Sequence, residues 1–329
     1  MKKPIIAITM GDAAGIGPEL IVKVLSQETV YESCAPFIVG DRKVMRDICR
    51  VVGANLRFKA IEKLSEARFS PSEVDVLWPK GLRIDHVPWG QVDPAMGRAA
   101  ALCLKTAFEM ALDGEVHGVV SAPLNKEAFH LAGYQYVDEL AYLADLTRSP
   151  EPYILGVMGS VWTVSVTEHV PFRDIADLIK KERVARYIGH MHDSLRKAGI
   201  TDPRIAVAAL NVHAADGGLF GRKEIDEIGP AIQEARKQEI NAQGPFPADT
   251  VFARALDGEF DGVVGMYHDQ PNIPRKLQPL SKRVTLFMGL PLVCGTTAHG
   301  TAFDKAGKGI ADPGGLQAAL RYTVMFSSY

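Results

Sequence analysis

DGVVGMYHDQ, which spans Asp261–Gln270, is the stretch of sequence that decides the fold. Its apolar part, centred on Val263 and Val264, predicts a short buried strand, and polar residues follow where that strand would end. Two further apolar runs have the same form. RIAVAAL (204–210) is followed by Asn-Val-His, and VWTVSV (161–166) is followed by Thr-Glu-His. Each of the three predicted strands is therefore followed closely by a histidine.

These histidines are His169, His213 and His268. In an open, mostly parallel sheet the carboxyl ends of the strands line one crevice, where ligands bind, so the three imidazoles are expected to converge. Three imidazoles with an open coordination position predict a divalent metal site that also takes substrate. A single histidine at a strand end is more often a hydrogen-bonded loop residue, and the strands alone leave both interpretations open.

The composition is that of an ordinary globular protein, because 47% of the 329 residues are hydrophobic and 23% are charged. A formal net charge of −2 argues against non-specific nucleic-acid binding, which needs a basic excess. No apolar run is long enough to span a membrane or to form a signal peptide. The cysteines are scattered without a CxxC pair, which indicates free thiols, and we expect a cytoplasmic protein.

The N-terminal segment predicts a strand over Ile5–Met10, a glycine turn, and a helix over Glu19–Leu25 with Pro18 at its start. Such a turn can bind an anion at the helix N-terminus. It is not a dinucleotide fingerprint, because Leu20 stands where the third glycine belongs. A binding loop and a tight structural turn are both compatible with this segment.

Strands and helices alternate along the rest of the chain, which predicts an α/β protein with three α/β/α layers. Asp249 is expected either to cap a helix or to face the metal as a carboxylate. The predicted elements are strands over 36–40 and 118–121, and helices over 42–51 (capped by Asp41), 96–112, 138–146, 174–198 and 223–238.

Several phrases resemble the 4-hydroxythreonine-4-phosphate dehydrogenase family of vitamin B6 synthesis and its sugar-acid and dihydrodiol dehydrogenase relatives. They occur in the family's order over nearly the whole length. The matching phrases are Gly11–Glu19 (GDAAGIGPE), Ala122–Lys126 (APLNK), Asn211–Ala214 (NVHA), Gly218–Gly221 (GLFG), Gly244–Thr250 (GPFPADT), Met266–Gln270 (MYHDQ) and His299–Ala302 (HGTA).

The resemblance implies a two-lobed subunit similar to isocitrate and isopropylmalate dehydrogenases, not a Rossmann domain. We expect a first lobe over 1–125 plus 280–329 and a second over 126–279, which carries the metal-binding histidines. The resemblance further implies a homodimer with the active site at its interface. It implies NAD, rather than NADP, as hydride acceptor. It also implies a divalent metal (Zn, Mg, Mn or Co) held by His169, His213 and His268.

Catalytic and cofactor residues follow from the same resemblance. Lys276 is expected to transfer a proton or to anchor a carboxylate. Asp249 and Asp269 are expected to orient ligand histidines through the ring nitrogen that is not on the metal. His299 and Gly300 are expected to line the nucleotide pocket.

The substrate pocket departs from the family pattern. Glu139 and Leu140 stand where the family has its substrate-binding His and Thr, and Thr285 and Cys294 replace its Asn and Arg, whereas Lys276 matches. A hydrogen bond to a charged group is worth about 1.5–3 kcal/mol, so losing the His, Thr and Arg contacts costs roughly 4–9 kcal/mol of phosphate binding.

We therefore predict a metal-dependent, NAD-linked dehydrogenase of a small hydroxy acid, with decarboxylation where the product is a β-keto acid. The altered pocket predicts that this acid is not the phosphorylated vitamin B6 intermediate. Two alternatives stay open. One is a true 4-hydroxythreonine-4-phosphate or 4-phosphotetronate dehydrogenase, and the other is a metal-dependent lyase or hydrolase that does not use NAD.

Overall fold

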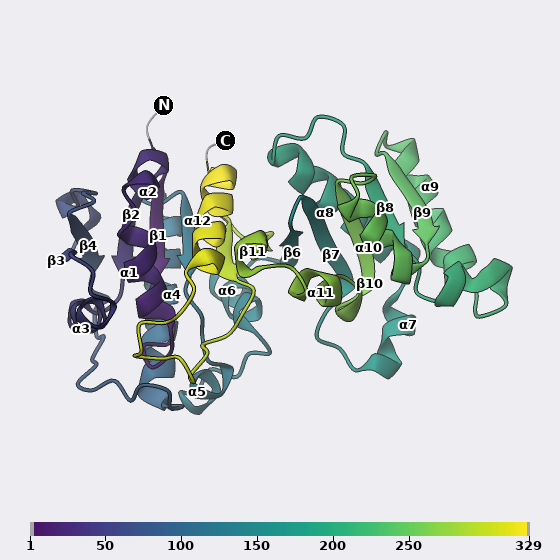
Figure 1. Cartoon of the computed structure of the whole chain (residues 1–329). Helices are drawn as coiled ribbons and strands as arrows, with labels where there is room; N and C mark the ends of the chain where they lie inside the picture. The colour runs from purple at the N-terminus through teal and green to yellow at the C-terminus, as the bar shows by residue number, and fades with distance from the viewer. Residues whose placement is uncertain (1–2, 328–329) are drawn as a thin grey trace. The chain divides into compact units, whose positions relative to one another are not determined.

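The computed structural model describes residues 3–327 of the chain. The chain divides into two compact units. The first unit comprises Met1–Tyr153 together with Val284–Tyr329, and the second is the continuous segment Ile154–Arg283. Figure 1 shows the helices and strands that make up each unit. The lobe limits expected from the sequence stay a prediction.

The strands of the first unit are parallel to their neighbours except for the antiparallel pair β11–β12. Nearly every residue of β1, β2 and β5 is buried, as expected for strands covered on both faces. Their order is β3 (Arg57–Ile61), β4 (Glu73–Leu77), β2 (Ala35–Val39), β1 (Ile5–Thr9), β5 (Gly118–Ser121), β12 (Cys294–Thr297) and β11 (Arg283–Met288).

The helices of the first unit form two groups on its strands. One group, whose members contact one another, is α1 (Gly17–Leu25), α2 (Glu28–Ser33), α3 (Arg42–Val52) and α12 (Gly314–Ser327). The other is α4 (Pro94–Leu112), α5 (Lys126–Leu131) and α6 (Glu139–Thr147).

The second unit has the same layered construction. Its strand order is β6 (Tyr153–Met158), β7 (Val161–Thr167), β10 (Gly262–Tyr267), β8 (Ile205–Ala208) and β9 (Ala242–Phe246). Only β6–β7 is an antiparallel pair among these described strands. The helices are α7 (Ile175–Leu178), α8 (Lys181–Lys197), α9 (Gly229–Lys237), α10 (Ala248–Leu256) and α11 (Asp269–Lys276). The predicted three-layer α/β/α class is confirmed.

Two predicted helical features are wrong in detail. The helix expected over 174–198 is interrupted, because Ile179 adopts an extended conformation, is fully buried, and accepts a hydrogen bond from Lys223 Nζ through its carbonyl at 3.1 Å. Asp249 does not cap α10, since it lies inside the first turn and Pro247 occupies the cap position. By contrast, Asp41 caps α3 as predicted, through Oδ1 and the amide of Lys43 at 2.7 Å.

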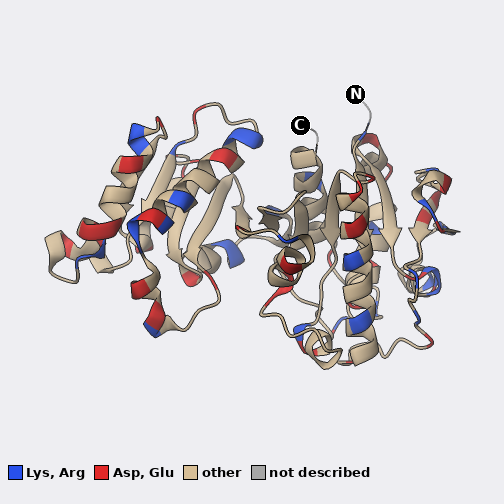
Figure 2. Ribbon diagram, turned by 180° about the vertical axis from the view of Figure 1, so that it is seen from behind, with Lys and Arg blue, Asp and Glu red and all other residues tan. Residues whose placement is uncertain are grey.

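Acidic and basic residues are interspersed along the helices of both units (Figure 2), in line with a formal net charge of −2. Within residues 3–327, no helix combines the length and apolarity needed to cross a membrane.

Candidate functional site

The carboxyl ends of β7 and β10 lie side by side, because the two strands are parallel neighbours with Thr167 opposite Tyr267. The Thr167 hydroxyl donates to the carbonyl of Met266 at 2.9 Å and joins the two strand ends. His169 follows the end of β7, and His268 follows the end of β10 directly before α11. Neighbouring parallel strands therefore bring these two histidines together, as the sequence predicted.

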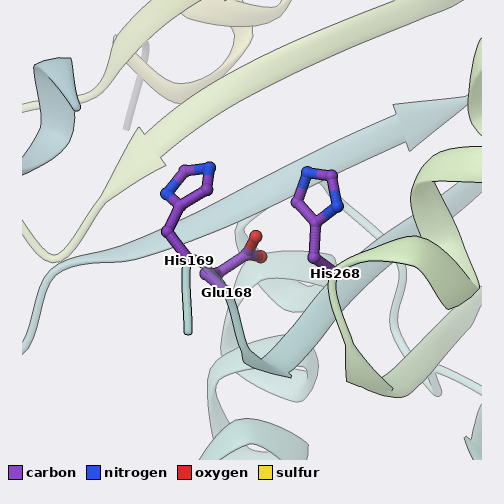
Figure 3. Close-up of side chains that lie close together, drawn as sticks. All are labelled: Glu168, His169 and His268. Carbon is purple, nitrogen blue, oxygen red and sulfur yellow. The ribbon is translucent and has the colours of Figure 1, made fainter. Parts of the chain in front are cut away.

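A carboxylate lies close to the two histidines. The ligand atoms of Glu168, His169 and His268 all lie within 4.8 Å of one another, and the imidazole centroids are 5.6 Å apart (Figure 3). This mixture of imidazole nitrogens and a carboxylate oxygen fits a divalent cation such as Zn²⁺, Mn²⁺ or Co²⁺. No sequence pattern indicated a role for Glu168, although it directly precedes a predicted ligand.

The pKa of the Glu168 carboxyl is raised above its usual value, and burial is the main cause. Burial raises the pKa of its carboxyl, whereas the charge of His268, the hydroxyl of Ser165 and the charge of Arg275 lower that pKa. Arg275 is only 7% exposed, and burial lowers the pKa of its guanidinium to about 10, although Glu168 acts to raise it. A buried cation therefore favours the ionised form of the Glu168 carboxylate.

Side chains of the HDQ sequence hold His268 in place. Asp269 Oδ1 lies 2.7 Å from His268 Nδ1, which leaves Nε2 of the ring for a metal. Gln270 bridges two strands, since its Oε1 accepts from the amide of Met266 at 2.6 Å and its Nε2 donates to the carbonyl of Ala209 at 2.9 Å. The expected orienting role of Asp269 agrees with this geometry.

His213 lies outside this group of described ligand residues. It belongs to the 3-10 segment Val212–Gly218 (η3), where the backbone is left-handed, with φ +51° at His213 itself. The Glu224 carboxylate fixes the preceding residues by accepting from the amides of Leu210 and Asn211 at 2.8 and 2.7 Å. The exposed His213 side chain is therefore carried away from the end of β8, and its role as a metal ligand stays a prediction.

A cavity of about 620 Å³ in the second unit brings His213 together with Asp249 and Asp269. Its other walls are largely apolar side chains of α10, α11 and the residues after β8. Lys276 is the last residue of α11 and is exposed, so its ammonium group is accessible to a ligand. The catalytic roles expected for Lys276 and Asp249 stay predictions.

The predicted substrate-binding residues of the first unit surround a buried carboxyl. Glu139 is the first residue of α6, and burial raises the pKa of its carboxyl to about 7, with the hydroxyl of Ser121 lowering it. Cys294 begins β12 and is fully buried, and burial and the charge of Glu139 raise the pKa of its thiol. Leu140 and Thr285 are also buried. No sequence pattern indicated that the Ser121 hydroxyl interacts with Glu139.

The glycine turn after β1 packs against the HGTA segment. All of residues 11–20 are buried, and the amide of Ile16 donates to the carbonyl of Thr301 at 3.0 Å. A Cβ at Gly15 would lie 2.8 Å from Thr301 Cβ, so only glycine allows this approach. The turn is thus a packed support for the segment that contains His299 and Gly300, the predicted cofactor residues.

Glu19 and Lys23 of α1 hold the chain that follows HGTA. The Glu19 carboxylate accepts from the amides of Gly309 and Ala311 at 3.0 and 2.6 Å. Lys23 Nζ donates to the carbonyls of the same two residues at 2.9 and 2.6 Å and pairs with Glu19 at 2.8 Å. We call this arrangement the Glu19–Lys23 clamp.

Known proteins of one family match this chain over nearly its whole length. The family model described as pyridoxal phosphate biosynthetic protein PdxA matches residues 32–323. The D-threonate 4-phosphate dehydrogenase of Cupriavidus necator is 41% identical, over 97% of this chain and 96% of that protein. A crystal structure of a 4-hydroxythreonine-4-phosphate dehydrogenase from Burkholderia phymatum is 39% identical, covers 99% of both chains and has a TM-score of 0.83.

More distant structures extend this similarity. A terephthalate 1,2-cis-dihydrodioldehydrogenase from Burkholderia xenovorans LB400 is 27% identical over 98% of both chains, with a TM-score of 0.68. An isocitrate dehydrogenase from Methylococcus capsulatus has a TM-score of 0.52 at 15% identity, over 98% of this chain and 85% of that one. The latter likeness is one of fold, and it confirms only that the subunit has a fold similar to that of isocitrate dehydrogenases.

Proposed function

Because the chain belongs to the family of the pyridoxal phosphate biosynthetic protein PdxA, we propose that it is a metal-dependent, NAD-linked dehydrogenase of a small hydroxy acid. The observation that carries this proposal is the grouping of His169, His268 and Glu168 at the ends of two parallel strands. The relatives named above as dehydrogenases support the reaction class.

A divalent cation at this grouping would lower the pKa of the substrate hydroxyl, and NAD would accept the hydride. His169 and His268 would hold the cation through ring nitrogens, with Asp269 fixing the orientation of His268. We assign proton transfer or the anchoring of a substrate carboxylate to Lys276, whose ammonium group is exposed. His299 and Gly300 are proposed to line the nucleotide pocket.

We further propose a homodimer in which His213 and Asp249 of one subunit serve the site of the other. Their support is an exposed apolar surface around the cavity of the second unit. Leu277 and Ile273, which line the cavity, are 81% and 62% exposed. Large apolar side chains gathered in one region mark a protein interface more often than a free surface. A partner seated there would cover the cavity that His213 and Asp249 line.

The substrate is proposed to lack the terminal phosphate. Glu139 places a carboxyl where the resemblance predicts a phosphate ligand, and Cys294 is a buried thiol where it predicts a guanidinium. Asp138 adds a second acid at the start of α6, and its side chain accepts from the amide of Ala141 at 2.8 Å. Negative charge and an occupied helix N-terminus both disfavour phosphate binding.

A second candidate is a 4-phosphorylated substrate. It is favoured by the name of the Cupriavidus necator relative, D-threonate 4-phosphate dehydrogenase, at 41% identity. Under this alternative, cations elsewhere on the chain would replace the missing phosphate ligands.

The test is NADH formation at 340 nm with added Mn²⁺ or Co²⁺, on D-threonate and D-threonate 4-phosphate as a matched pair. We expect kcat/KM for D-threonate 4-phosphate to stay below about 10⁴ M⁻¹s⁻¹, the low end for ordinary enzymes. For D-threonate or another unphosphorylated hydroxy acid, kcat/KM should exceed this value. A Glu139→His, Cys294→Arg double variant should gain activity on the phosphorylated acid.

Higher activity of the unchanged protein on the phosphorylated acid would establish the second candidate. If NAD neither raises the melting temperature nor is reduced with any hydroxy acid, the dehydrogenase proposal is wrong, and a metal-dependent lyase or hydrolase takes its place.

A further inference from the structure

The chain turns sharply at His169. The amide of Val170 donates to the carbonyl of Glu168 at 2.9 Å, which closes a three-residue turn centred on His169. Successive side chains of a strand point to opposite faces, and this turn ends that alternation. The Glu168 carboxylate and the His169 imidazole thereby come close to His268 at the end of the neighbouring strand (Figure 3).

We propose that Glu168 is itself a metal ligand, so that Glu168, His169 and His268 of one subunit hold a divalent cation with two imidazoles and one carboxylate. The inference rests on the proposed function only in taking this group as the metal centre. Metal–ligand bonds of about 2.0–2.2 Å place ligand atoms roughly 3–3.5 Å apart. The present spacing of at most 4.8 Å is wider than that range, so cation binding requires the three side chains to move closer together.

Glu168 is half-buried, and its surroundings include a buried positive charge. Taking a carboxylate out of water is costly unless a counter-charge accompanies it. Arg275 supplies that charge from α11 and is almost completely buried. Gly156 on β6 makes room for it, since a Cβ there would lie 2.5 Å from Arg275 Nη1. The Arg275 guanidinium also donates to the side-chain oxygen of Asn272.

This arrangement predicts opposite effects of two substitutions on cation affinity. Glu168→Gln removes a negative ligand, so cation binding weakens. Arg275→Met removes a positive charge next to that ligand, so cation binding tightens by Coulomb's law. The effect of Glu168→Gln depends on Glu168 being a ligand, whereas Arg275→Met reports only that the cation lies near Arg275.

The experiment measures Co²⁺ binding rather than turnover. The full-length protein is freed of metal with a chelator and titrated with Co²⁺, followed by calorimetry and by the visible absorption of the bound ion. We expect Glu168→Gln to raise Kd at least about tenfold, because losing even a group that only orients a ligand costs that much. Glu168→Asp should lie between the wild type and Glu168→Gln, since it keeps a shorter carboxylate.

Glu227→Gln is the matched control. Glu227 is a partly buried acid of the second unit whose Oε1 lies 3.6 Å from Lys180, and it is outside the Glu168 group. Its variant should bind Co²⁺ as the wild type does. If Glu168→Gln binds Co²⁺ with a Kd within twofold of the wild type, the inference is overturned. A folding failure of Glu168→Gln, seen by circular dichroism, leaves Glu168→Asp to decide on the same readout.

The outcomes separate this inference from the proposed function. Loss of Co²⁺ binding in Glu168→Gln, with no hydroxy acid oxidised by the wild type, upholds the ligand and refutes the dehydrogenase. Oxidation of a hydroxy acid by the wild type, with unchanged Co²⁺ binding in Glu168→Gln, supports the dehydrogenase and refutes Glu168 as a metal ligand.

Discussion

Asp12 is a buried carboxyl whose replacement should change how stability depends on pH. Its side chain is fully buried in the turn after β1, and Oδ1 accepts from the amide of Ala14 at 2.9 Å. Within residues 3–327, Oδ2 has no hydrogen-bond partner. Burial raises the pKa of Asp12 from 3.8 to about 6, with the Ala14 amide lowering it and the charge of Asp93 raising it.

The sign of the effect follows from linkage. A carboxyl with a raised pKa in the folded state binds its proton more tightly there, so the folded protein loses stability as pH rises from about 4 to about 6. A shift of about 2 units corresponds to roughly 3 kcal/mol, which applies in full above pH ~7. Of this penalty, roughly 1.5 kcal/mol develops between pH ~5 and pH ~7.5.

Asp12→Asn removes this ionisation and keeps the acceptor for Ala14. Its new amide group is buried without a partner and costs about 1–3 kcal/mol, but this cost is the same at every pH. The free energy of unfolding of the variant relative to the wild type should therefore rise by roughly 1.5 kcal/mol between pH ~5 and pH ~7.5.

Urea unfolding at the two pH values measures this difference, with fluorescence of Trp78 and Trp89 reporting on the first unit. Asp257→Asn, at an exposed position after α10, controls for the loss of one charge. A difference between variant and wild type that does not change with pH would refute the reasoning.

Three further predictions concern other parts of the molecule. Glu19→Gln weakens the Glu19–Lys23 clamp and should lower the free energy of unfolding of the first unit by about 1.5–3 kcal/mol, and an unchanged urea midpoint would contradict this. Because the pKa of Glu139 is raised to about 7, kcat/KM for an anionic substrate should fall as pH rises from 6 to 8. Glu139→Gln should flatten that profile, and equal profiles would exclude Glu139 from the pocket. Leu277→Asp should yield monomers in sedimentation at micromolar concentration, whereas Val51→Asp, on the first unit, should not.

Local signals made much of the fold predictable. The strand over 118–121 was predicted with the bounds that the structure gives, because its apolar residues are buried on both faces. The cap of α3 was predicted from Asp41 alone, since a cap depends on only a few neighbouring residues. The interruption near Ile179 was not predictable, because it depends on burial and on a contact with the distant Lys223.

The candidate site was predictable in part for similar reasons. His169 and His268 come together because their strands are adjacent and parallel. The carboxyl ends of parallel strands always lie at the same edge of a sheet, so this proximity could be expected from the sequence. Glu168 was missed because strand alternation would place it opposite His169, and only the turn at His169 overrides that rule. His213 follows its strand through a left-handed segment whose direction no sequence pattern indicated.

The Glu19–Lys23 clamp has a consequence for the order in which the two units fold during synthesis. It joins residues that are 286 to 292 positions apart. The contacts of α1 can therefore form only after nearly the entire chain has been synthesised. The second unit is one continuous segment, and all of its residues emerge before residue 284 does. It can therefore fold on the ribosome while the first unit is still unfinished. A truncated chain that ends near residue 290 and is released from the ribosome should contain a protease-resistant second unit and an unprotected first one.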